Sequence, residues 1–381
     1  LMMEGTRNRT PRELEEAIDD LGANIVVITG RETMILQANC LASKFDETFD
    51  LAREILLEPR WDEKEFDRMK AQNLEAIHRG NANPPTIAVN TFNRLLYGEG
   101  HMFSIPIIGT TAMVESISID DLKDYYNRSF SASVAYVAVV GAVTKPEAVS
   151  TFGGLEADWP AAEVVLPELP ATPEIDQSRL YFVDVPQAKQ SRIRIGHMGM
   201  AYSDADYYPA IVMNYQLGGN FNAVLNMILR EEKGYTYGAR SGFQGTNHPG
   251  PFVARAAVQS RTTFESLTIF RDEIASYRQG VSDDDIAYTK SALVKANARA
   301  FETLGALRTM INRIGLYDLD DDYMRQREQY VREFDAEEHQ RLAGQYIDPD
   351  NMIYLVVGDA ATQLEPLKAF GLGEPIVLEV E

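Results

Sequence analysis

The amino-acid sequence predicts an α+β protein built from two similar domains. Amphipathic helix patterns alternate with short apolar strand patterns, one strand-and-glycine pattern occurs in both halves, and a proline-rich stretch separates the halves. A chain of 381 residues is also too long for one ordinary hydrophobic core. Its length fits two domains of about 190 residues each.

The first half begins with a helix and two strands. Thr10-Pro-Arg-Glu13 is a capping box, so a helix is predicted to begin there and to end at Gly22. Residues 25–28 and 33–42 are predicted to be strands joined by a turn. Further elements are predicted as helices near 46–57, 62–78, 84–96 and 120–130, and as a buried strand over 134–141.

The second half follows a similar plan. Its predicted elements are strands at 180–185 and 190–198, a helix over 204–217, a Gly218-Gly219 turn, a short helix that carries Arg230, strands near 237–244 and 251–259, long helices, a helix over 336–346 and a strand over 351–358. The 134–141 strand recurs 217 residues later at 351–358, and 66–70 matches 286–290 at an offset of 220. The two halves therefore look like an internal duplication.

Domain boundaries follow from the proline-rich stretch. Residues 159–176 contain Pro160, Pro167, Pro170 and Pro173 without apolar periodicity, which is the composition of a semi-rigid linker. We therefore predict an N-terminal domain over 1–158, a linker over 159–176 and a C-terminal domain over 177–381.

Composition excludes several classes of function. A formal net charge of -21 repels a phosphate backbone, so nucleic acid is not an expected partner. No apolar run reaches the roughly 20 residues that would span a bilayer, so no membrane is expected either. Cys40 is the single cysteine, so an internal disulfide and a cysteine-based zinc site are excluded. Cys40 lies in an apolar stretch and is predicted to be a packing residue.

The segment Leu229-Arg-Glu-Glu-Lys-Gly-Tyr-Thr-Tyr237 allows two interpretations. Arg230 follows an apolar stripe at helical spacing, and Gly234 is a helix stop, so Arg230 lies in the last helical turn. A cation there stabilises the helix by a few tenths of a kcal/mol through the helix dipole. The alternative is functional: Arg230 and the hydroxyl of Tyr237 would hold a peptide carbonyl.

Several motifs, taken in order, resemble those of the insulinase (pitrilysin) family, which includes the mitochondrial processing peptidases. They are Glu4-Gly-Thr-Arg-Asn-Arg-Thr-Pro11, Leu21-Gly22, Pro106-Ile-Ile-Gly-Thr110, Val139-Val-Gly141, Leu217-Gly-Gly-Asn-Phe221 and Leu229 to Tyr237. The resemblance covers essentially the whole chain. It implies two homologous α+β domains, each a mostly antiparallel sheet packed with helices.

The resemblance also implies a site. Active members bind zinc through His-x-x-Glu-His and a third carboxylate, and the glutamate of that motif is the general base. In the second domain, an arginine and a tyrosine seven residues apart bind the substrate and its tetrahedral intermediate. These map onto Arg230 and Tyr237. The strand segment Ile25-Val26 and the Gly218-Gly219 pair map onto substrate-binding positions.

This chain departs from the family pattern at the metal site. Its histidines, which are His78, His101, His197, His248 and His339, do not stand at ligand spacing on one helix. The family's metal helix would fall at or before position 1, and Leu1 begins inside what resembles a structured element without signal-peptide features. Where relatives have the third zinc carboxylate this chain has Ala76. The adjacent Glu75 is a metal candidate only if the motif lies upstream.

Three functional hypotheses follow from this pattern. In the first, the chain is a subunit without metal, inactive alone, that supplies Arg230 and Tyr237 to the zinc site of a His-x-x-Glu-His subunit in a heterodimer for peptide hydrolysis, with a homodimer as the alternative assembly. In the second, it is a complete zinc peptidase whose motif precedes residue 1. In the third, it is a scaffold or peptide-binding subunit. Zinc is expected in the partner, and the periplasm is the predicted compartment with the cytoplasm as the alternative.

Overall fold

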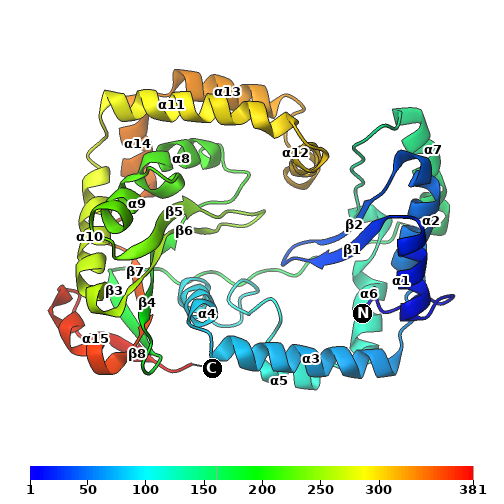
Figure 1. Ribbon diagram of the computed structural model, residues 1–381, viewed down its shortest axis with the longest axis horizontal. Helices are drawn as coiled ribbons and strands as arrows, with labels where there is room; N and C mark the ends of the chain where they lie inside the picture. The colour runs from blue at the N-terminus through cyan, green and yellow to red at the C-terminus, as the bar shows by residue number, and fades with distance from the viewer. Residues whose placement is uncertain (160, 381) are drawn as a thin grey trace. The chain divides into compact units, whose positions relative to one another are not determined.

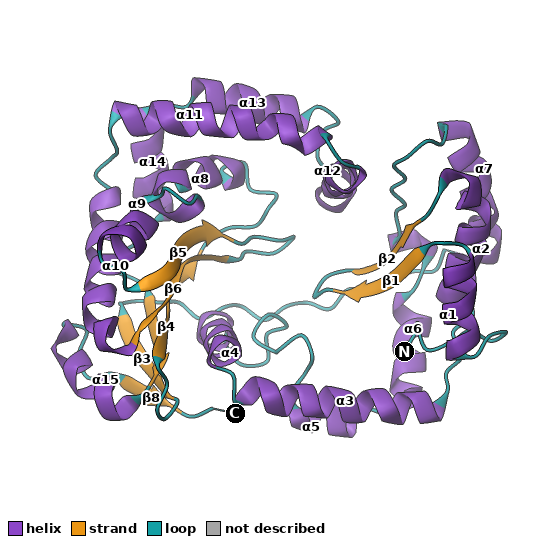
Figure 2. Cartoon of the chain, viewed as in Figure 1, coloured by secondary structure: helices purple, strands orange, loops and turns teal. Residues whose placement is uncertain are grey.

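The computed structural model describes residues 1–159 and 161–380 (Figures 1 and 2). Pro160, the first proline of the predicted linker, lies outside the described residues. The chain forms two compact units. Unit 1 contains residues 1–79, 106–169 and 303–312, and unit 2 contains residues 80–105, 170–302 and 313–381. The two units are described separately below.

Unit 1 is mainly helical and has one β-hairpin. Its elements are α1 (Pro11–Asp20), β1 (Asn24–Thr29), β2 (Met34–Asn39), η1 (Ala42–Lys44), α2 (Phe45–Leu57), α3 (Glu63–Asn81), α5 (Thr111–Ser116), α6 (Ile119–Ser129), η2 (Ala132–Val134), α7 (Lys145–Asp158) and the first part of α12 (Leu304–Tyr317). The predicted capping box is confirmed at Thr10 and Glu13. A small core under the hairpin contains Leu14, Ile25 and Ile55.

The strand predicted over 134–141 is absent. Residues 135–140 have no regular structure. Val134, Tyr136 and Val137 are exposed. In the described part of unit 1, the only sheet is the antiparallel hairpin of β1 and β2, so this apolar segment has no neighbouring strand to pair with. β-branched and aromatic side chains favour a strand only where a neighbouring strand supplies hydrogen bonds and packing. The prediction was therefore wrong here.

Unit 2 is organised around a six-stranded mixed sheet in the order β5-β6-β4-β7-β3-β8. The strands are β3 (Arg179–Asp184), β4 (Gln190–Met198), β5 (Thr236–Phe243), β6 (Pro251–Gln259), β7 (Ile353–Gly358) and β8 (Ile376–Leu378). Strand β3 pairs in parallel with β7 and β8, and the other pairs are antiparallel. The predicted 351–358 strand is confirmed as β7, all of which is buried.

The helices of unit 2 cover the sheet from two sides (Figure 1). They are α4 (Pro84–Tyr97), α8 (Tyr207–Met213), η3 (Tyr215–Gly219), α9 (Val224–Asn226), η4 (Met227–Glu232), η5 (Ser260–Thr262), α10 (Thr263–Tyr277), α11 (Asp283–Ala298), η6 (Arg299–Phe301), the end of α12, α13 (Tyr323–Glu333), α14 (Ala336–Tyr346), α15 (Ala360–Leu367) and η7 (Lys368–Phe370).

Strand residues alternate between the two faces of the sheet. Ile193, Phe252 and Tyr354 belong to the main core with α8, α10 and α14, whereas helix α4 packs against β4 and β7 on the opposite face.

The compact units and the predicted domains divide the chain differently. Helix α4 belongs to unit 2 although its residues fall within the predicted 1–158 domain, and residues 303–312 belong to unit 1. The predicted boundaries describe a sequence duplication and stay a prediction. The mixed α and β character of the chain is confirmed. Among the described helices, none combines the length and the apolar composition that a membrane span requires.

Candidate functional site

Arg230 lies in η4, a π-helical segment that follows the single turn of α9. The helix ends as the sequence predicts. Gly234 has a φ of +66°, its amide donates to the Arg230 carbonyl at 3.1 Å, and the Tyr235 amide donates to the Leu229 carbonyl at 2.8 Å. A left-handed glycine with these crossed bonds satisfies the last helical carbonyls. The wider π turn was not predicted.

The side chain of Arg230 is held but accessible. Its guanidinium carbon lies 4.5 Å from the centroid of the Phe221 ring, and its Nε lies 3.3 Å from Glu231 Oε1. About a third of the side chain, 36%, is exposed. A cation over an aromatic face at an exposed position is stabilised by about 0.5–1 kcal/mol. Phe221 therefore fixes the guanidinium while leaving donors available to a ligand.

Tyr237 lies in a β-bulge of the edge strand β5. Thr236 pairs with Val258 and Ala239 pairs with Ala256, so β5 has one extra residue between these pairs. Thr236 Oγ1 accepts from the Gly238 amide at 3.1 Å and donates to the Ala257 carbonyl at 2.7 Å, which holds the bulge in place. A bulge redirects side chains. Tyr237 is 89% exposed, and within the described chain its hydroxyl makes no hydrogen bond.

Asn226 joins the Arg230 segment to the Tyr237 strand. It is 1% exposed, its Nδ2 donates to the Phe221 carbonyl at 2.7 Å, and its Oδ1 accepts from the Ala239 amide at 3.0 Å. One side chain thus connects the residue beneath Arg230 to the end of the bulge that carries Tyr237. Asn226 was not predicted from the sequence to be a site residue. The available signal was a polar side chain within an apolar helical stripe.

The Gly218-Gly219 pair forms part of the π-helical segment η3 rather than a turn. A Cβ at Gly218 would come within 2.2 Å of the Ser241 nitrogen, so glycine is required for η3 to pack against β5. Asn214 fixes the same contact, because it donates to the Ser241 carbonyl at 2.9 Å and accepts from the Ser241 hydroxyl at 2.6 Å. Gly218 is buried and Gly219 is exposed. The packing role of Gly218 is clear, and its substrate-binding role stays a prediction.

The remaining predicted site residues belong to unit 1. Ile25 is buried in the small core and Val26 is half-buried, so Ile25 does not present its side chain to a ligand. The hairpin pairs β1 with β2 alone among the described strands, so the other edge of β1 keeps backbone groups that a peptide strand could use. Glu75 lies on α3, is exposed, and pairs with Arg79 at 2.9 Å.

The residues that the structure describes do not fit a zinc ion. Among them, no group of three or more histidine, cysteine, aspartate and glutamate side chains is arranged to hold a metal. His197 is buried, with Nδ1 2.7 Å from the Met198 carbonyl and Nε2 accepting from the Asp348 amide at 3.2 Å. His339 packs against Tyr277, and burial lowers the pKa of His339 to about 4. Both histidines are packing residues.

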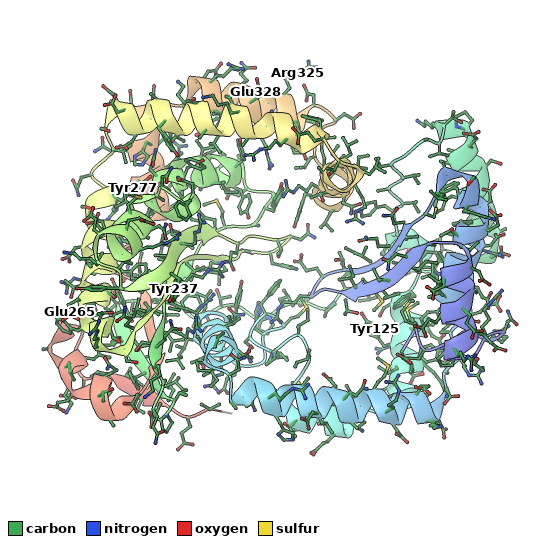
Figure 3. The ribbon with its side chains drawn as sticks, in the orientation of Figure 1. Tyr125, Tyr237, Glu265, Tyr277, Arg325 and Glu328 are labelled. Carbon is green, nitrogen blue, oxygen red and sulfur yellow. The ribbon has the colours of Figure 1, made fainter. Side chains whose placement is uncertain are left out.

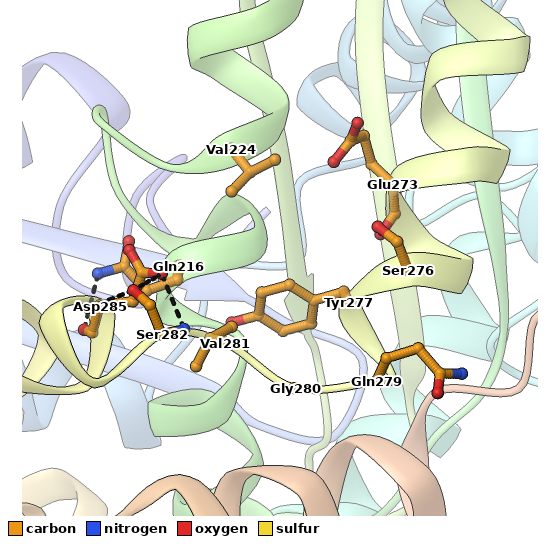
Figure 4. Close-up of a pocket in the computed structure, with 10 residues that line it drawn as sticks. All are labelled: Gln216, Val224, Glu273, Ser276, Tyr277, Gln279, Gly280, Val281, Ser282 and Asp285. Atoms are coloured by element: carbon orange, nitrogen blue, oxygen red, sulfur yellow. Dashed lines mark hydrogen bonds between the residues drawn. The ribbon is translucent and has the colours of Figure 1, made fainter.

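A separate hollow of about 360 Å³ lies beside η3 and the start of α11 (Figure 4). Its polar groups are largely engaged in the fold. Gln216 Nε2 donates to the Asp285 carbonyl at 3.0 Å, and the Tyr277 hydroxyl donates to the Met213 carbonyl at 2.6 Å. Burial, with Asp272 second, raises the pKa of Glu273 at its rim. Neither Arg230 nor Tyr237 lines this hollow.

Known protein families match most of the chain. Residues 1–110 match the family described as "Insulinase (Peptidase family M16)", and residues 116–293 match "Peptidase M16 inactive domain". The second match contains both Arg230 and Tyr237.

Similar proteins include two curated relatives and a solved structure. An uncharacterized zinc protease of Streptomyces coelicolor is 24% identical over 326 residues, which is 84% of this chain and 70% of that protein. A probable mitochondrial-processing peptidase subunit beta of Arabidopsis thaliana is 25% identical over 222 residues, which is 57% of this chain and 41% of that protein. The structure of a peptidase M16 inactive domain from Pseudomonas fluorescens has a TM-score of 0.88 at 21% identity, over 95% of this chain and 87% of that one. At this level of identity, the similarity to the Pseudomonas fluorescens structure shows the fold alone.

Proposed function

Because this chain belongs to the peptidase M16 (insulinase) family, we propose that it is the non-catalytic subunit of a zinc peptidase and supplies Tyr237 and Arg230 to a partner's site. The observation that carries the proposal is the presentation of Tyr237. A bulge exposes 89% of this residue and leaves its hydroxyl without a hydrogen bond in the described chain. An exposed phenol held by a rigid strand has a free donor for a ligand.

The proposed chemistry is stabilisation of charge. When a peptide bond is attacked, negative charge develops on the carbonyl oxygen, and a positioned hydroxyl donor stabilises it. Tyr237 would donate to that oxygen. Arg230, stacked on Phe221, would donate to a second carbonyl of the peptide and hold the substrate in place. The partner would supply the metal and the attacking water.

One observation supports a role for this chain outside the metal site. Residues 116–293, which include Arg230 and Tyr237, match a domain described as inactive. A relative whose name includes "subunit beta" of a processing peptidase is consistent with a paired assembly. A heterodimer with a His-x-x-Glu-His subunit is therefore the proposed form, and a homodimer is the alternative assembly.

The test measures peptide hydrolysis by the chain alone, by a His-x-x-Glu-His subunit from the same cell alone, and by their mixture. We expect activity only in the mixture. Tyr237→Phe should lower its turnover by about 100-fold to 1000-fold, because it removes one oxyanion donor. Tyr125→Phe is the matched control, because Tyr125 is also exposed, at 51%, and lies in α6 of unit 1 (Figure 3).

Two results would replace the proposal with another. Zinc-dependent hydrolysis by the purified chain alone would favour a complete peptidase. Unchanged activity of the mixture with Tyr237→Phe and with Arg230→Ala would favour a scaffold or peptide-binding subunit. The periplasm stays the proposed compartment, and fractionation of cells that make the native protein tests it.

A further inference from the structure

Three arginines lie directly opposite one another on neighbouring strands of the unit 2 sheet. Arg194 of β4 pairs with Arg255 of β6, and Arg255 pairs with Arg240 of β5. We call these three residues the arginine row. Within the described chain, none of the three guanidinium groups forms an ion pair or a hydrogen bond, although the chain carries a net charge of -21. Like charges directly opposite on a sheet destabilise it. The row therefore lowers the stability of the fold, and its presence needs a reason other than stability.

The row extends from a buried end to an open end. Arg194 is 7% exposed, its guanidinium carbon lies 5.1 Å from the Phe92 ring of α4, and its Nε has no hydrogen-bond partner. Burial, with Arg255 second, lowers the pKa of Arg194 to about 10. Arg255 and Arg240 are exposed. A buried cation without a counter-ion favours binding of an anion beside it.

The row lies on the same face of the sheet as Tyr237. Ala256 and Val258 of β6 face the main core, so Ala257 and Arg255 face the opposite side. The bulge places Tyr237 opposite Ala257, between the Thr236 and Ala239 pairs. Ala257 and Arg255 are two residues apart in β6, a separation of about 7 Å in an extended strand. The exposed phenol and the row are therefore neighbours.

We propose that the arginine row binds a carboxylate of a peptide beside Tyr237, so that unit 2 selects peptides with an acidic side chain or a terminal carboxylate at that position. A guanidinium presents a rigid fork of donors that matches a carboxylate in two-point contact. A nucleic acid is disfavoured because the rest of the chain repels polyanions. The inference deepens the proposed function by naming a class of substrate. It rests on that function only in treating the bound peptide as a substrate.

Binding can be measured without any hydrolysis. Fluorescence anisotropy would follow three labelled peptides of equal length with the full chain. One has internal aspartates and an amidated end, one has a free terminal carboxylate and no acidic side chain, and one has neither. We expect the first or the second to bind more tightly than the third, and their comparison shows which carboxylate is used.

Arginine variants connect binding to the row. Arg255→Gln should weaken binding of the preferred acidic peptide by about 10-fold, since one charge-assisted contact is lost. Arg255→Lys keeps the charge but loses the fork, so we expect weakening of binding that is smaller than for glutamine. Arg325→Gln is the matched control, because Arg325 is exposed, forms no ion pair in the described chain and lies on α13 (Figure 3). Circular dichroism confirms that each variant is folded.

Each contrary result identifies what is wrong. Equal binding of all three peptides, or unchanged binding by Arg255→Gln, would overturn the inference. Displacement of the acidic peptide by inorganic phosphate at far lower concentration than by free acidic peptide would assign the row to phosphate. If acidic peptides bind through Arg255 but the mixture with the partner never hydrolyses them, the proposed function fails and the carboxylate site stands. If the mixture loses activity with Tyr237→Phe while Arg255→Gln binds the acidic peptide as tightly as wild type, the proposed function stands and the carboxylate site fails.

Discussion

Arg230 and Tyr237 are held by different means at the residue scale. Tyr237 is fixed through the backbone of its bulge, whereas the Arg230 guanidinium is fixed through its contact with the exposed ring of Phe221. A long arginine side chain loses considerable rotamer freedom when it is held in one place. Phe221 lowers that cost at the moment of binding because the side chain is already stacked.

Phe221→Leu should therefore weaken substrate binding without impairing the chemical step. The stacking contributes about 0.5–1 kcal/mol, so we expect KM in the mixture with the partner to rise by about two-fold to five-fold at nearly unchanged kcat. Phe221→Tyr keeps an aromatic face and should restore KM. A fall in kcat that the tyrosine variant does not restore would contradict this account of Phe221.

Arg255→Gln should stabilise the free protein. Arg255 faces a like charge on each side, from Arg194 and Arg240, and each opposed pair costs roughly 0.2–1 kcal/mol. Removing the central charge relieves both opposed pairs and should raise the free energy of unfolding by about 0.4–2 kcal/mol at low salt. The gain should shrink at high salt, because the exposed charges are then screened.

Urea unfolding at low and high salt measures this effect, with Arg325→Gln as the charge-matched control. Destabilisation by Arg255→Gln beyond the control would show that the fold itself satisfies Arg255. Together with weaker binding of an acidic peptide, a more stable variant would indicate that stability is given up for recognition.

At the scale of elements, two π-helical segments close the free edge of β5. Asn214 in the turn before η3 binds the Ser241 carbonyl, and Asn226 before η4 binds the Ala239 amide. An edge strand with unpaired backbone groups would otherwise be open to another strand. These asparagines occupy the groups that a peptide would use. A peptide is therefore not expected to add as a strand at β5, and the sheet face beside Tyr237 remains for binding.

Asn226→Ala should destabilise the protein and loosen the bulge. It leaves the Ala239 amide unpaired in a buried position, which costs about 1–3 kcal/mol, and it also removes the hydrogen bond to the Phe221 carbonyl. Faster hydrogen exchange of the Ala239 amide, together with a lower urea midpoint, would confirm this. Asn222→Ala is the control, since Asn222 is exposed and, within the described chain, its side chain makes a single hydrogen bond, to the Tyr288 hydroxyl at 3.0 Å. An Ala239 amide that stays protected in Asn226→Ala would contradict this role.

Local signals predicted local structure well. The capping box at Thr10, the glycine stop at Gly234 and the apolar strand now seen as β7 depend on residues close in sequence, and the structure confirms each. The 134–141 segment was mispredicted because strand formation depends on a neighbouring strand. The bulge at Tyr237 depends on a cross-strand register and on Asn226, which lies 13 residues from its partner Ala239. Periodicity alone does not contain that information.

At the scale of the whole molecule, acidification has two opposing effects on stability, one through the net charge and one through a buried histidine. The net charge of -21 falls in magnitude toward the pI of about 4.7, which reduces self-repulsion as the solution is acidified. His339 acts against this, because it is 1% exposed, its ring nitrogens have no partner among the described residues, and burial lowers its pKa to about 4. An unfolded histidine titrates near 6.5.

The sign of the His339 effect follows from proton uptake. Between about pH 6.5 and pH 4 the unfolded chain binds a proton at residue 339 that the folded chain does not, so acidification favours unfolding. The full contribution is at most about 3–4 kcal/mol and is present above pH 6.5. His339→Leu removes the titrating group from a site whose neighbours are the rings of Tyr277 and Phe334. The variant should therefore lose less stability than the wild type on acidification.

Urea unfolding of the wild type and of His339→Leu at pH 7 and pH 5 isolates the contribution of His339. The other titrating groups, including the carboxylates, are the same in both proteins. We expect the difference in unfolding free energy between His339→Leu and wild type to grow in favour of the variant at pH 5. His78→Leu is the control, since it makes the same substitution at an exposed histidine near the end of α3. A constant difference at both pH values would mean that His339 is protonated to the same extent in the folded and unfolded chains. Acid sensitivity would then have to arise from the carboxylates.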